Sequence, residues 1–155
     1  MRIVPFRPEH ARALRLRSFD ELCLAGLGPG LDRAALWRFY HAAGPSFTGL
    51  GRGGVVACGG VVLARPGEGE GWALTGPEVP RHALSFHRAF ARLLPAVAEE
   101  CGLARITTLV HAGHAVSRRW LGRLGFREAG LRPGLLGGET YIHCVRETPC
   151  QQQHP

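Results

Sequence analysis

The sequence contains no lysine. All 19 of its basic residues are arginine, and with 12 acidic residues they give a formal net charge of +7. The complete absence of lysine indicates a bias in codon or genome composition; the alternative is selection for arginine chemistry. A basic surface can attract phosphates, nucleic acid or acidic cofactors. The arginines are spread along the chain with few aromatic side chains between them, so a nucleic-acid-binding module is only weakly indicated.

Long apolar runs are also lacking. No run approaches the roughly 18 residues of a membrane-spanning helix, and we expect no membrane partner. Residues 1–7 lack the apolar core and the small-residue cleavage site of a signal peptide. The five cysteines form no Cys-x-x-Cys pair, and four of them lie in apolar segments, where a free thiol behaves as a small hydrophobic side chain. These absences favour a reduced, cytoplasmic compartment.

What is present suits one globular domain. A length of 155 residues with 45% hydrophobic and 20% charged residues is enough for a single core. We assign residues 1–147 to this domain and expect the polar residues 148–155 to form a disordered tail. No internal repeat and no linker divides the domain.

Apolar periodicity, interrupted by glycine and proline, predicts the order β-α-α-β-β-β-α-β-α-β-β. Strands are predicted at residues 2–6, 47–50, 54–64, 70–75, 105–111, 126–131 and 139–146, and helices at residues 8–25, 32–43, 80–101 and 114–124. Pro95 lies inside the long helix, where a proline costs roughly 3 kcal/mol, so we expect a kink or a break there. The Arg132-Pro133-Gly134 segment is predicted to lie in the connection between the last two strands.

The predicted fold class is α/β, of the mixed α+β kind, with one sheet of six to seven strands and helices on both faces. The meander of residues 46–76 should be antiparallel because its turns are short. The strand-helix-strand unit of residues 70–111 needs a crossover, so its two strands should be parallel and the connection right-handed.

Two stretches carry a resemblance to a known family. Residues 59–62 (Gly-Gly-Val-Val), a hairpin and residues 72–74 (Trp-Ala-Leu) resemble the central strand pair of the GNAT superfamily of acyl-CoA N-acyltransferases. Residues 117–126 resemble the final helix of that family, which ends in a Gly-Phe step into the next strand. The order of elements over residues 2–146 agrees with the same family.

The resemblance implies that acetyl-CoA, or another acyl-CoA, lies between the strands of residues 70–76 and 105–111. The start of the long helix would receive the pyrophosphate, because unpaired N–H groups and the helix dipole favour an anion there. The cofactor-binding residues implied in this way are Leu74, Thr75, Gly76, Arg81, His82, Ala83, Ser117 and Trp120.

Two departures from the family pattern stand out. Residues 79–87 contain none of the glycines that usually close around the phosphates, and Pro80 has no N–H to offer. The tyrosine that protonates the leaving thiolate in many members is replaced by Leu121, or by Trp120 if the alignment slips by one residue. The place of a frequent asparagine falls at about His114. Ser117 could hydrogen-bond a thiolate, or it could serve only to cap the helix.

The acylation of an amine also needs a group that accepts the amine proton. Glu70 and Glu78 flank the proposed cofactor strand, and His111 ends the facing strand, so these three are the catalytic candidates. The alternative is that the two acids are solvated loop residues and that His111 bonds only to backbone. His111 and His114 have no third ligand at a useful spacing, so no metal site is predicted.

The sequence therefore predicts an N-acetyltransferase-like protein that uses direct attack on acyl-CoA. Its acceptor would be a small-molecule or peptide amine, bound by residues 22–40 and the late strands. One alternative is a catalytically inactive GNAT-like binding or structural protein, such as a phage-related one. A basic nucleic-acid-binding module is the third. Because proteins of this family often pair, a homodimer is also open.

Overall fold

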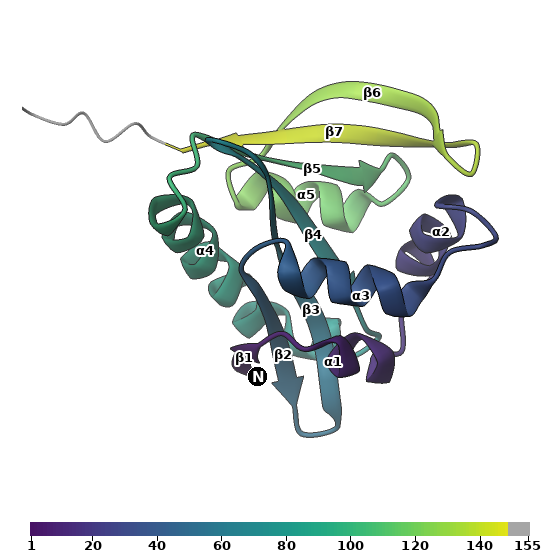
Figure 1. Ribbon diagram of the computed structural model, residues 1–155, viewed down its shortest axis with the longest axis vertical. Coiled ribbons are helices and arrows are strands. Elements are labelled where there is room, and N and C mark those ends of the chain that lie inside the picture. The colour runs from purple at the N-terminus through teal and green to yellow at the C-terminus, as the bar shows by residue number, and fades with distance from the viewer. Residues whose placement is uncertain (149–155) are drawn as a thin grey trace, which may run out of the picture.

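The computed structural model describes residues 1–148, in which seven strands and five helices follow the predicted order except that the first predicted helix is divided into two (Figure 1). Residues 149–155 lie outside the described part, and with them almost all of the tail predicted at residues 148–155. The strands are β1 (Arg2–Pro5), β2 (Ser46–Gly51), β3 (Gly54–Arg65), β4 (Glu68–Thr75), β5 (Arg105–His111), β6 (Arg127–Leu136) and β7 (Glu139–Glu147). The helices are α1 (Pro8–Ala13), α2 (Ser18–Gly26), α3 (Arg33–Ala42), α4 (Ala83–Glu100) and α5 (Ala115–Arg123), with a 3-10 turn, η1 (Val79–His82), before α4.

The strands form one mixed sheet in the order β1-β2-β3-β4-β5-β7-β6. All neighbouring strands are antiparallel except β4 and β5, which are parallel and are joined through α4. The predicted antiparallel meander and the predicted parallel crossover are both confirmed. The fold class, a mixed sheet with helices on both faces, is confirmed as well.

The helices cover the two faces of the sheet with separate cores. Helices α1, α2 and α3 pack on one face, around Phe6, Trp37 and Leu74. Helices α4 and α5 cover the other face, where Ile106 and Val110 of β5 are buried. Figure 1 shows α3 crossing in front of β3 and β4 while α5 lies behind β5. The sheet therefore separates two sides of the molecule, and β4 and β5 lie at its centre.

The first helix differs from the prediction because it is two helices. Leu14 follows α1 with extended backbone angles (φ −75°, ψ 121°), and α2 begins only at Ser18. Between them the backbone N–H of Arg17 donates to the carbonyl of Thr75 at 3.0 Å. This bond to a distant strand replaces a bond within the helix, so the continuous helix predicted for residues 8–25 is wrong.

Two prolines lie inside regular elements. Helix α4 continues through Pro95 to Glu100, so of the two outcomes predicted there, a kink or a break, the break is absent. The Arg132-Pro133-Gly134 segment lies within β6 rather than in a loop. β6 is one of the two edge strands of the sheet, and its pairing with β7 is irregular between Arg132 and Leu136, where a proline needs no ladder bond.

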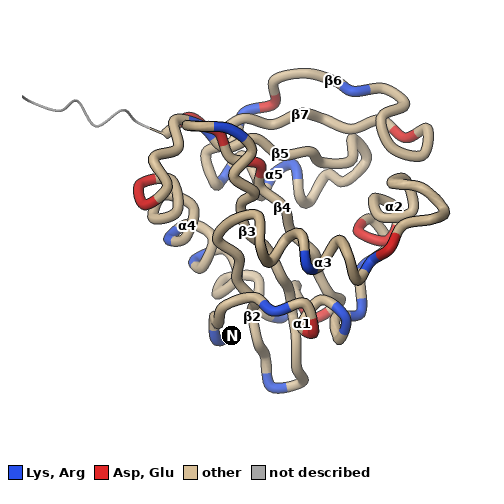
Figure 2. The backbone as a smooth tube through the Cα atoms, in the orientation of Figure 1, with Lys and Arg blue, Asp and Glu red and all other residues tan. Residues whose placement is uncertain are grey.

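Charged residues are dispersed over the described part of the chain. Figure 2 shows basic residues on elements of both halves of the molecule, interspersed with acidic ones. Within residues 1–148, no helix combines the length and the hydrophobicity needed to cross a membrane.

Candidate functional site

The centre of the sheet contains a gap between β4 and β5. The two strands pair only where Glu68–Glu70 meets Arg105–Thr107, yet β4 continues to Thr75 and β5 to His111. The last link across the gap is a side-chain bond, from the hydroxyl of Thr108 to the carbonyl of Gly71 at 2.9 Å. Beyond it the strands separate, while β5 stays paired with β7 along its full length.

Within residues 1–148, backbone groups along the walls of the gap take part in no strand pairing. In an antiparallel pair, alternate residues direct N–H and C=O to one neighbour. Gly76 donates to Val56, so in β4 the even-numbered residues bond to β3 and Ala73 must face β5. In β5 the even-numbered residues bond to β7, so Leu109 must face β4. Ala73 and Leu109 both lie beyond the paired segment, and their N–H and C=O groups therefore form the two rims of the gap.

The open end of β4 is held by α2. The carbonyl of Thr75 accepts from Arg17, and its hydroxyl donates to a carboxylate oxygen of Asp20 at 2.6 Å. Burial raises the pKa of Asp20, although the bond from Thr75 opposes this effect. These bonds fix the position of α2 over the mouth of the gap.

The cofactor-binding residues predicted near the end of β4 are distributed unevenly around the gap. The side chain of Leu74 is buried in the core beneath α1–α3, and the N–H of Gly76 is bonded to β3. A side chain at Gly76 would meet Leu14 at 2.9 Å and the backbone of Val56 at 3.0 Å, so this turn requires a glycine. Thr75 lies at the mouth, but Ala73, which lines the gap directly, was not predicted.

The junction between β4 and α4 contains an ion pair between two predicted site residues. The guanidinium of Arg81 contacts the carboxylate of Glu78 at 2.8 Å, and both side chains are exposed. His82 precedes α4 without a side-chain cap, and Ala83 is the first residue of the helix. The hydroxyl of Ser85 donates to the carbonyl of His82 at 3.0 Å. Arg81, predicted to bind phosphate, therefore already forms an ion pair with Glu78, predicted as a general base.

Helix α5 contributes an aromatic stack and a hydrogen-bonded pair. Trp120 packs against Phe86 and Phe90 of α4, with ring centroids 5.0 Å apart in each case. The indole N–H of Trp120 is buried and finds no acceptor within residues 1–148. Leu121, at the place of the family tyrosine, is buried in the core. One turn earlier, Ser117 bonds to the imidazole of His114.

The three catalytic candidates lie at different points along the gap. Glu70 is exposed at the narrow end, where pairing stops, and no ion pair involves it in the described part of the chain. Glu78 lies beyond the mouth. His111 ends β5, where its Nε2 contacts Glu139 at 2.8 Å and its Nδ1 accepts from the N–H of Gly113 at 2.9 Å. His111 must therefore carry its proton on Nε2 and donate it to Glu139.

A group of polar side chains under α2 falls within residues 22–40 and the late strands, the segments predicted to bind the acceptor. Cys23 of α2 contributes to the pKa of both Tyr40 and Tyr141. Burial, with smaller contributions from Cys23 and Glu70, raises the pKa of Tyr40 to about 12. Burial and Cys23 raise the pKa of Tyr141 to about 12. Burial also raises the pKa of Cys23 itself. Both phenols and the thiol are therefore protonated at neutral pH.

Glu139 is a further candidate that sequence reasoning missed. It begins β7 directly after Gly137 and Gly138, and the pairing of His111 with Tyr141 brings it to the end of β5. That register depends on the whole β5–β7 ladder, so the only local signal was an acid following a glycine turn. Among the described residues, no group of three or more His, Cys, Asp or Glu side chains could hold a metal ion.

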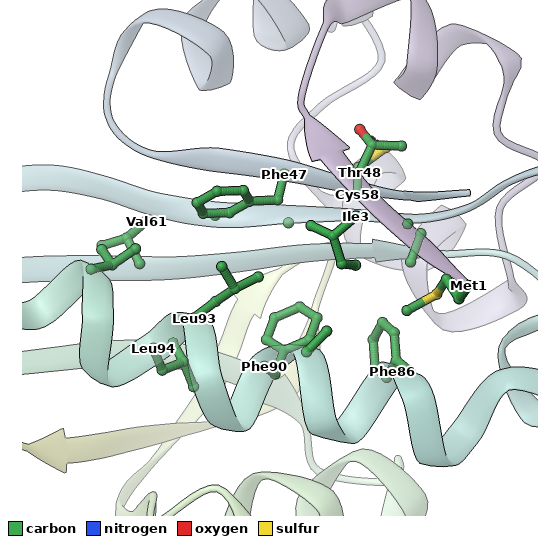
Figure 3. A pocket seen from close by; sticks show the side chains of 16 residues that line it. Met1, Ile3, Phe47, Thr48, Cys58, Val61, Phe86, Phe90, Leu93 and Leu94 are labelled. Carbon is green, nitrogen blue, oxygen red and sulfur yellow. Dashed lines mark hydrogen bonds between the residues drawn. The ribbon is translucent and has the colours of Figure 1, made fainter. Parts of the chain in front are cut away.

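An apolar pocket lies apart from the gap, between α4 and strands β1–β3 (Figure 3). Figure 3 shows Phe90 and Leu93 of α4 pointing toward Phe47 and Ile3 on the strands. The pocket exists because β3 carries glycine here: a side chain at Gly59 would meet Phe90 at 3.1 Å. Its water-accessible space is about 40 Å³, room for only a few water molecules. The acid–base groups lie at the gap, and we place the candidate site there.

Comparison with known proteins supports the fold through structure rather than sequence. No family model and no curated protein matches the sequence. The structure is similar to a ribosomal-protein-S18-alanine N-acetyltransferase from Escherichia coli, with a TM-score of 0.71, 17% identity and coverage of 99% of this chain and 98% of that one. It is also similar to a GNAT-family acetyltransferase from Bacillus anthracis (TM-score 0.70, 15% identity, coverage 94% and 93%).

A third similar structure is a chimeric spermidine N-acetyltransferase from Vibrio cholerae and hSSAT, with a TM-score of 0.67, 12% identity and coverage of 95% and 96%. All three similarities extend over nearly the whole length of both chains. At these identities they establish the architecture and leave the chemistry to be argued from the residues. The chain has the fold of the GNAT N-acetyltransferases.

Proposed function

We propose that this protein is an acyl-CoA-dependent N-acyltransferase that acts by direct attack of an amine on the thioester. The observation that carries the proposal is the gap between β4 and β5, with the backbone of Ala73 on one rim and of Leu109 on the other. The pantetheine arm of CoA contains two secondary amides. It can therefore pair with unpaired strand backbone in the way that an added strand does.

The two sides of the sheet would serve the two substrates. The side chain of Ala73 faces α4, opposite to Leu74, so the acyl-CoA arm would lie on the side of α4 and α5. Glu70 and Trp72 share the face of Leu74, so the amine would approach from the side of α1–α3. The gap lets the thioester and the amine meet through the sheet.

Glu70 is the proposed general base. The neutral amine attacks the thioester carbonyl carbon, a C–N bond forms, and the C–S bond breaks with its electron pair on sulfur. The amine proton passes to the carboxylate, directly or through one water. Glu70 is exposed and without an ion pair among the described residues, whereas Glu78 is bound to Arg81. Nδ1 of His111 already accepts a hydrogen bond from the N–H of Gly113, so it is not free to accept the amine proton. Glu139, which contacts Nε2 of His111, is therefore the second choice of general base.

A covalent acyl-enzyme is not required by this arrangement. Cys23 lies on α2, on the proposed acceptor side, and burial raises its pKa, so little of it would be a thiolate at neutral pH. Direct attack needs only the base and a bound thioester. The acceptor would be an amine that fits between α2, α3 and the end of β7.

Two measurements test the proposal. Acetyl-CoA at about 100 times its dissociation constant should stabilise the fold by roughly 2.7 kcal/mol, which for a domain of this size raises the melting temperature by a few degrees. Release of free CoA thiol should then depend on an added amine. Because similar structures include a protein alanine acetyltransferase and a spermidine acetyltransferase, peptide amino termini and polyamines are the first acceptors to try. No melting shift at millimolar acetyl-CoA would refute the proposal.

A catalytically inactive binding protein is the second candidate, and specific observations favour it. Pro80 offers no N–H at the phosphate junction, Arg81 is paired with Glu78, and Trp120 fills space between α4 and α5. This candidate predicts no thiol release with any amine, whether or not acetyl-CoA raises the melting temperature. Binding to arbitrary DNA with a steep salt dependence would instead indicate the third candidate, a nucleic-acid-binding module.

A further inference from the structure

The apolar pocket between α4 and strands β1–β3 offers a ligand no free polar side chain. Among the described residues that line it, only Thr48 and Cys58 have polar side chains. The Thr48 hydroxyl lies 2.9 Å from Nδ1 of His10 and 3.7 Å from the Cys58 thiol, so both groups are already hydrogen-bonded. Cavities lined by apolar side chains stay dry and take up apolar molecules. An occupant of this pocket must therefore be a hydrocarbon group.

The pocket and the gap share one face of the sheet. Phe47 of β2 is paired with Gly59 of β3, and Gly59 is paired with Ala73 of β4. Directly paired residues point to the same face of a sheet, so this row runs beneath α4 from the floor of the pocket to the rim of the gap. The proposed acyl-CoA arm lies on this side as well. The pocket therefore begins one strand away from the place proposed for the thioester.

Phe90 of α4 separates the pocket from the gap. A side chain at Gly59 would come within 3.1 Å of the tip of the Phe90 ring and 3.6 Å of the Cα atom of Ala73, so this ring lies above the glycine and beside the rim. The ring also packs against Trp120 of α5, with centroids 5.0 Å apart. Phe90 is only half-buried and forms part of the pocket wall (Figure 3). A change of rotamer at this one side chain therefore joins the two spaces.

We propose that the pocket receives the hydrocarbon tail of the acyl group, so that the preferred donor is a CoA thioester with a longer chain than acetyl. The proposal rests on the proposed acyl transfer, and the bonds made and broken are the same. With the thioester at the gap, the tail runs along the sheet beneath α4, past Phe90 and over Gly59. Burial there removes its methylene groups from water, which is the main favourable contribution to the binding of an aliphatic chain.

The size of the pocket sets the length of the chain. Its water-accessible space of about 40 Å³ corresponds to roughly three water molecules, and a methylene group is similar in size to a water molecule. The pocket lies one strand spacing, about 4.8 Å, from the rim of the gap, a distance that roughly four carbons cross. The expected acyl chain therefore has about eight carbons.

The first test is a calorimetric titration of the whole chain with acetyl-, butyryl-, hexanoyl-, octanoyl- and dodecanoyl-CoA. Each methylene that enters the pocket should lower the dissociation constant by about fourfold, so octanoyl-CoA should bind at least about 50-fold more tightly than acetyl-CoA. Dodecanoyl-CoA should gain nothing further, because the pocket is then full. An affinity that rises steadily up to dodecanoyl-CoA would contradict the proposal, since it would indicate a tail that lies on an open surface.

Filling the pocket should remove the preference for longer chains. Ala89 of α4 lines the pocket, and Ala89→Leu extends a larger aliphatic side chain into it. The affinity of octanoyl-CoA relative to acetyl-CoA should fall by about tenfold or more. Ala96→Leu adds the same group at an exposed position of the same helix, outside the pocket lining, and should leave this ratio unchanged. An equal ratio in Ala89→Leu and wild type would place the tail elsewhere and refute the proposal.

A measurement on wild type does not depend on how a variant folds. Met1 is the only methionine of the chain and lines the pocket, so its methyl resonance reports on the occupancy of the pocket. Octanoyl-CoA should shift this resonance. Acetyl-CoA, whose acyl group ends at the gap, should leave it in place.

The outcomes separate this inference from the proposed function. If acetyl-CoA and octanoyl-CoA bind equally tightly and neither shifts the Met1 methyl resonance, the role of the pocket is refuted while acyl-CoA binding stands. If neither thioester binds, both are refuted. If octanoic acid alone shifts the Met1 resonance and octanoyl-CoA does not, the pocket is a separate site for free aliphatic molecules, and the inference is refuted as well.

Discussion

The two ends of the proposed co-substrate path are built differently. The gap between β4 and β5 provides backbone N–H and C=O groups for hydrogen bonding. Its rims at Ala73 and Leu109 depend on strand geometry and tolerate many side chains. The junction between β4 and α4 offers side chains, and there Arg81 is paired with Glu78 and Pro80 has lost its N–H. Features made by the sheet are thus present, while features that depend on particular residues differ from the family pattern.

This difference implies that the gap, more than the junction, determines whether the protein binds an acyl-CoA. An exposed ion pair contributes about 0–1 kcal/mol, so its rearrangement could adjust affinity but not create it. Hydrogen bonds along a strand edge are several and are partly sheltered from water. The following predictions compare the two regions, from the largest expected effect to the smallest.

Replacing the carboxylate of Glu70 should slow the reaction strongly, whereas replacing that of Glu78 should hardly change its rate. Glu70→Gln, at the gap, should lower kcat by about 100-fold or more, because a general base typically contributes 10²–10⁴-fold. Glu78→Gln, at the junction, is the matched control and should leave kcat within about twofold. Rates of thiol release from acetyl-CoA with a saturating amine measure both. If Glu78→Gln is the slower variant, the base lies at the junction and our assignment is wrong.

Removing a backbone donor from the gap should weaken binding. Ala73→Pro deletes an N–H that faces the gap and makes no hydrogen bond to β3, so the sheet should survive the substitution. An amide carbonyl of the bound ligand would lose its donor. We expect acetyl-CoA affinity to fall by about 10- to 100-fold in a calorimetric titration. The melting temperature of the free variant checks that the fold remains. Unchanged affinity in a folded variant would place the arm elsewhere.

Releasing Arg81 at the junction should strengthen binding modestly. Glu78→Gln removes the carboxylate that pairs with the guanidinium at 2.8 Å, so a phosphate no longer competes with it. We expect acetyl-CoA affinity to rise by about threefold, and Arg81→Ala to lower it by a similar factor, in keeping with an exposed ion pair. If neither change alters affinity, Arg81 does not contact phosphate.

The mouth of the gap should show a small pH dependence of stability. Burial raises the folded-state pKa of Asp20 above its ordinary 3.8, so the folded state holds this proton more tightly than the unfolded state does. The resulting stabilisation is fully present below about pH 3.8 and is lost as the pH rises through the folded-state pKa. Melting temperatures of wild type should therefore fall relative to Asp20→Asn over this window. Parallel curves would show that Asp20 titrates as it does in the unfolded chain.

The sequence predicted the sheet better than it predicted the contacts made across it. Local periodicity was sufficient for the order of elements and the parallel β4–β5 unit. The break after Leu14 could not be predicted, because it follows from a bond between Arg17 and a strand about sixty residues away. The position of Pro133 inside β6 depends on β6 being an edge strand.

The site was predictable in position but not in its pairings. The register of β5 with β7 brings Glu139 to His111, and no local pattern contains that register. Glu78 and Arg81, by contrast, lie three residues apart, and their spacing alone could have indicated an ion pair. Ala73 was overlooked because an alanine side chain suggests no chemistry, whereas its contribution comes from the backbone.

Amide hydrogen exchange at the two rims tests the central claim most directly. The N–H groups of Ala73 and Leu109 should exchange at least about tenfold more slowly when the protein is saturated with acetyl-CoA, because a hydrogen-bonded amide is protected until the bond opens. Leu74, whose N–H already faces β3, should change much less. If acetyl-CoA binds and stabilises the fold while Ala73 and Leu109 exchange at their original rates, the co-substrate does not lie in the gap and the account is wrong.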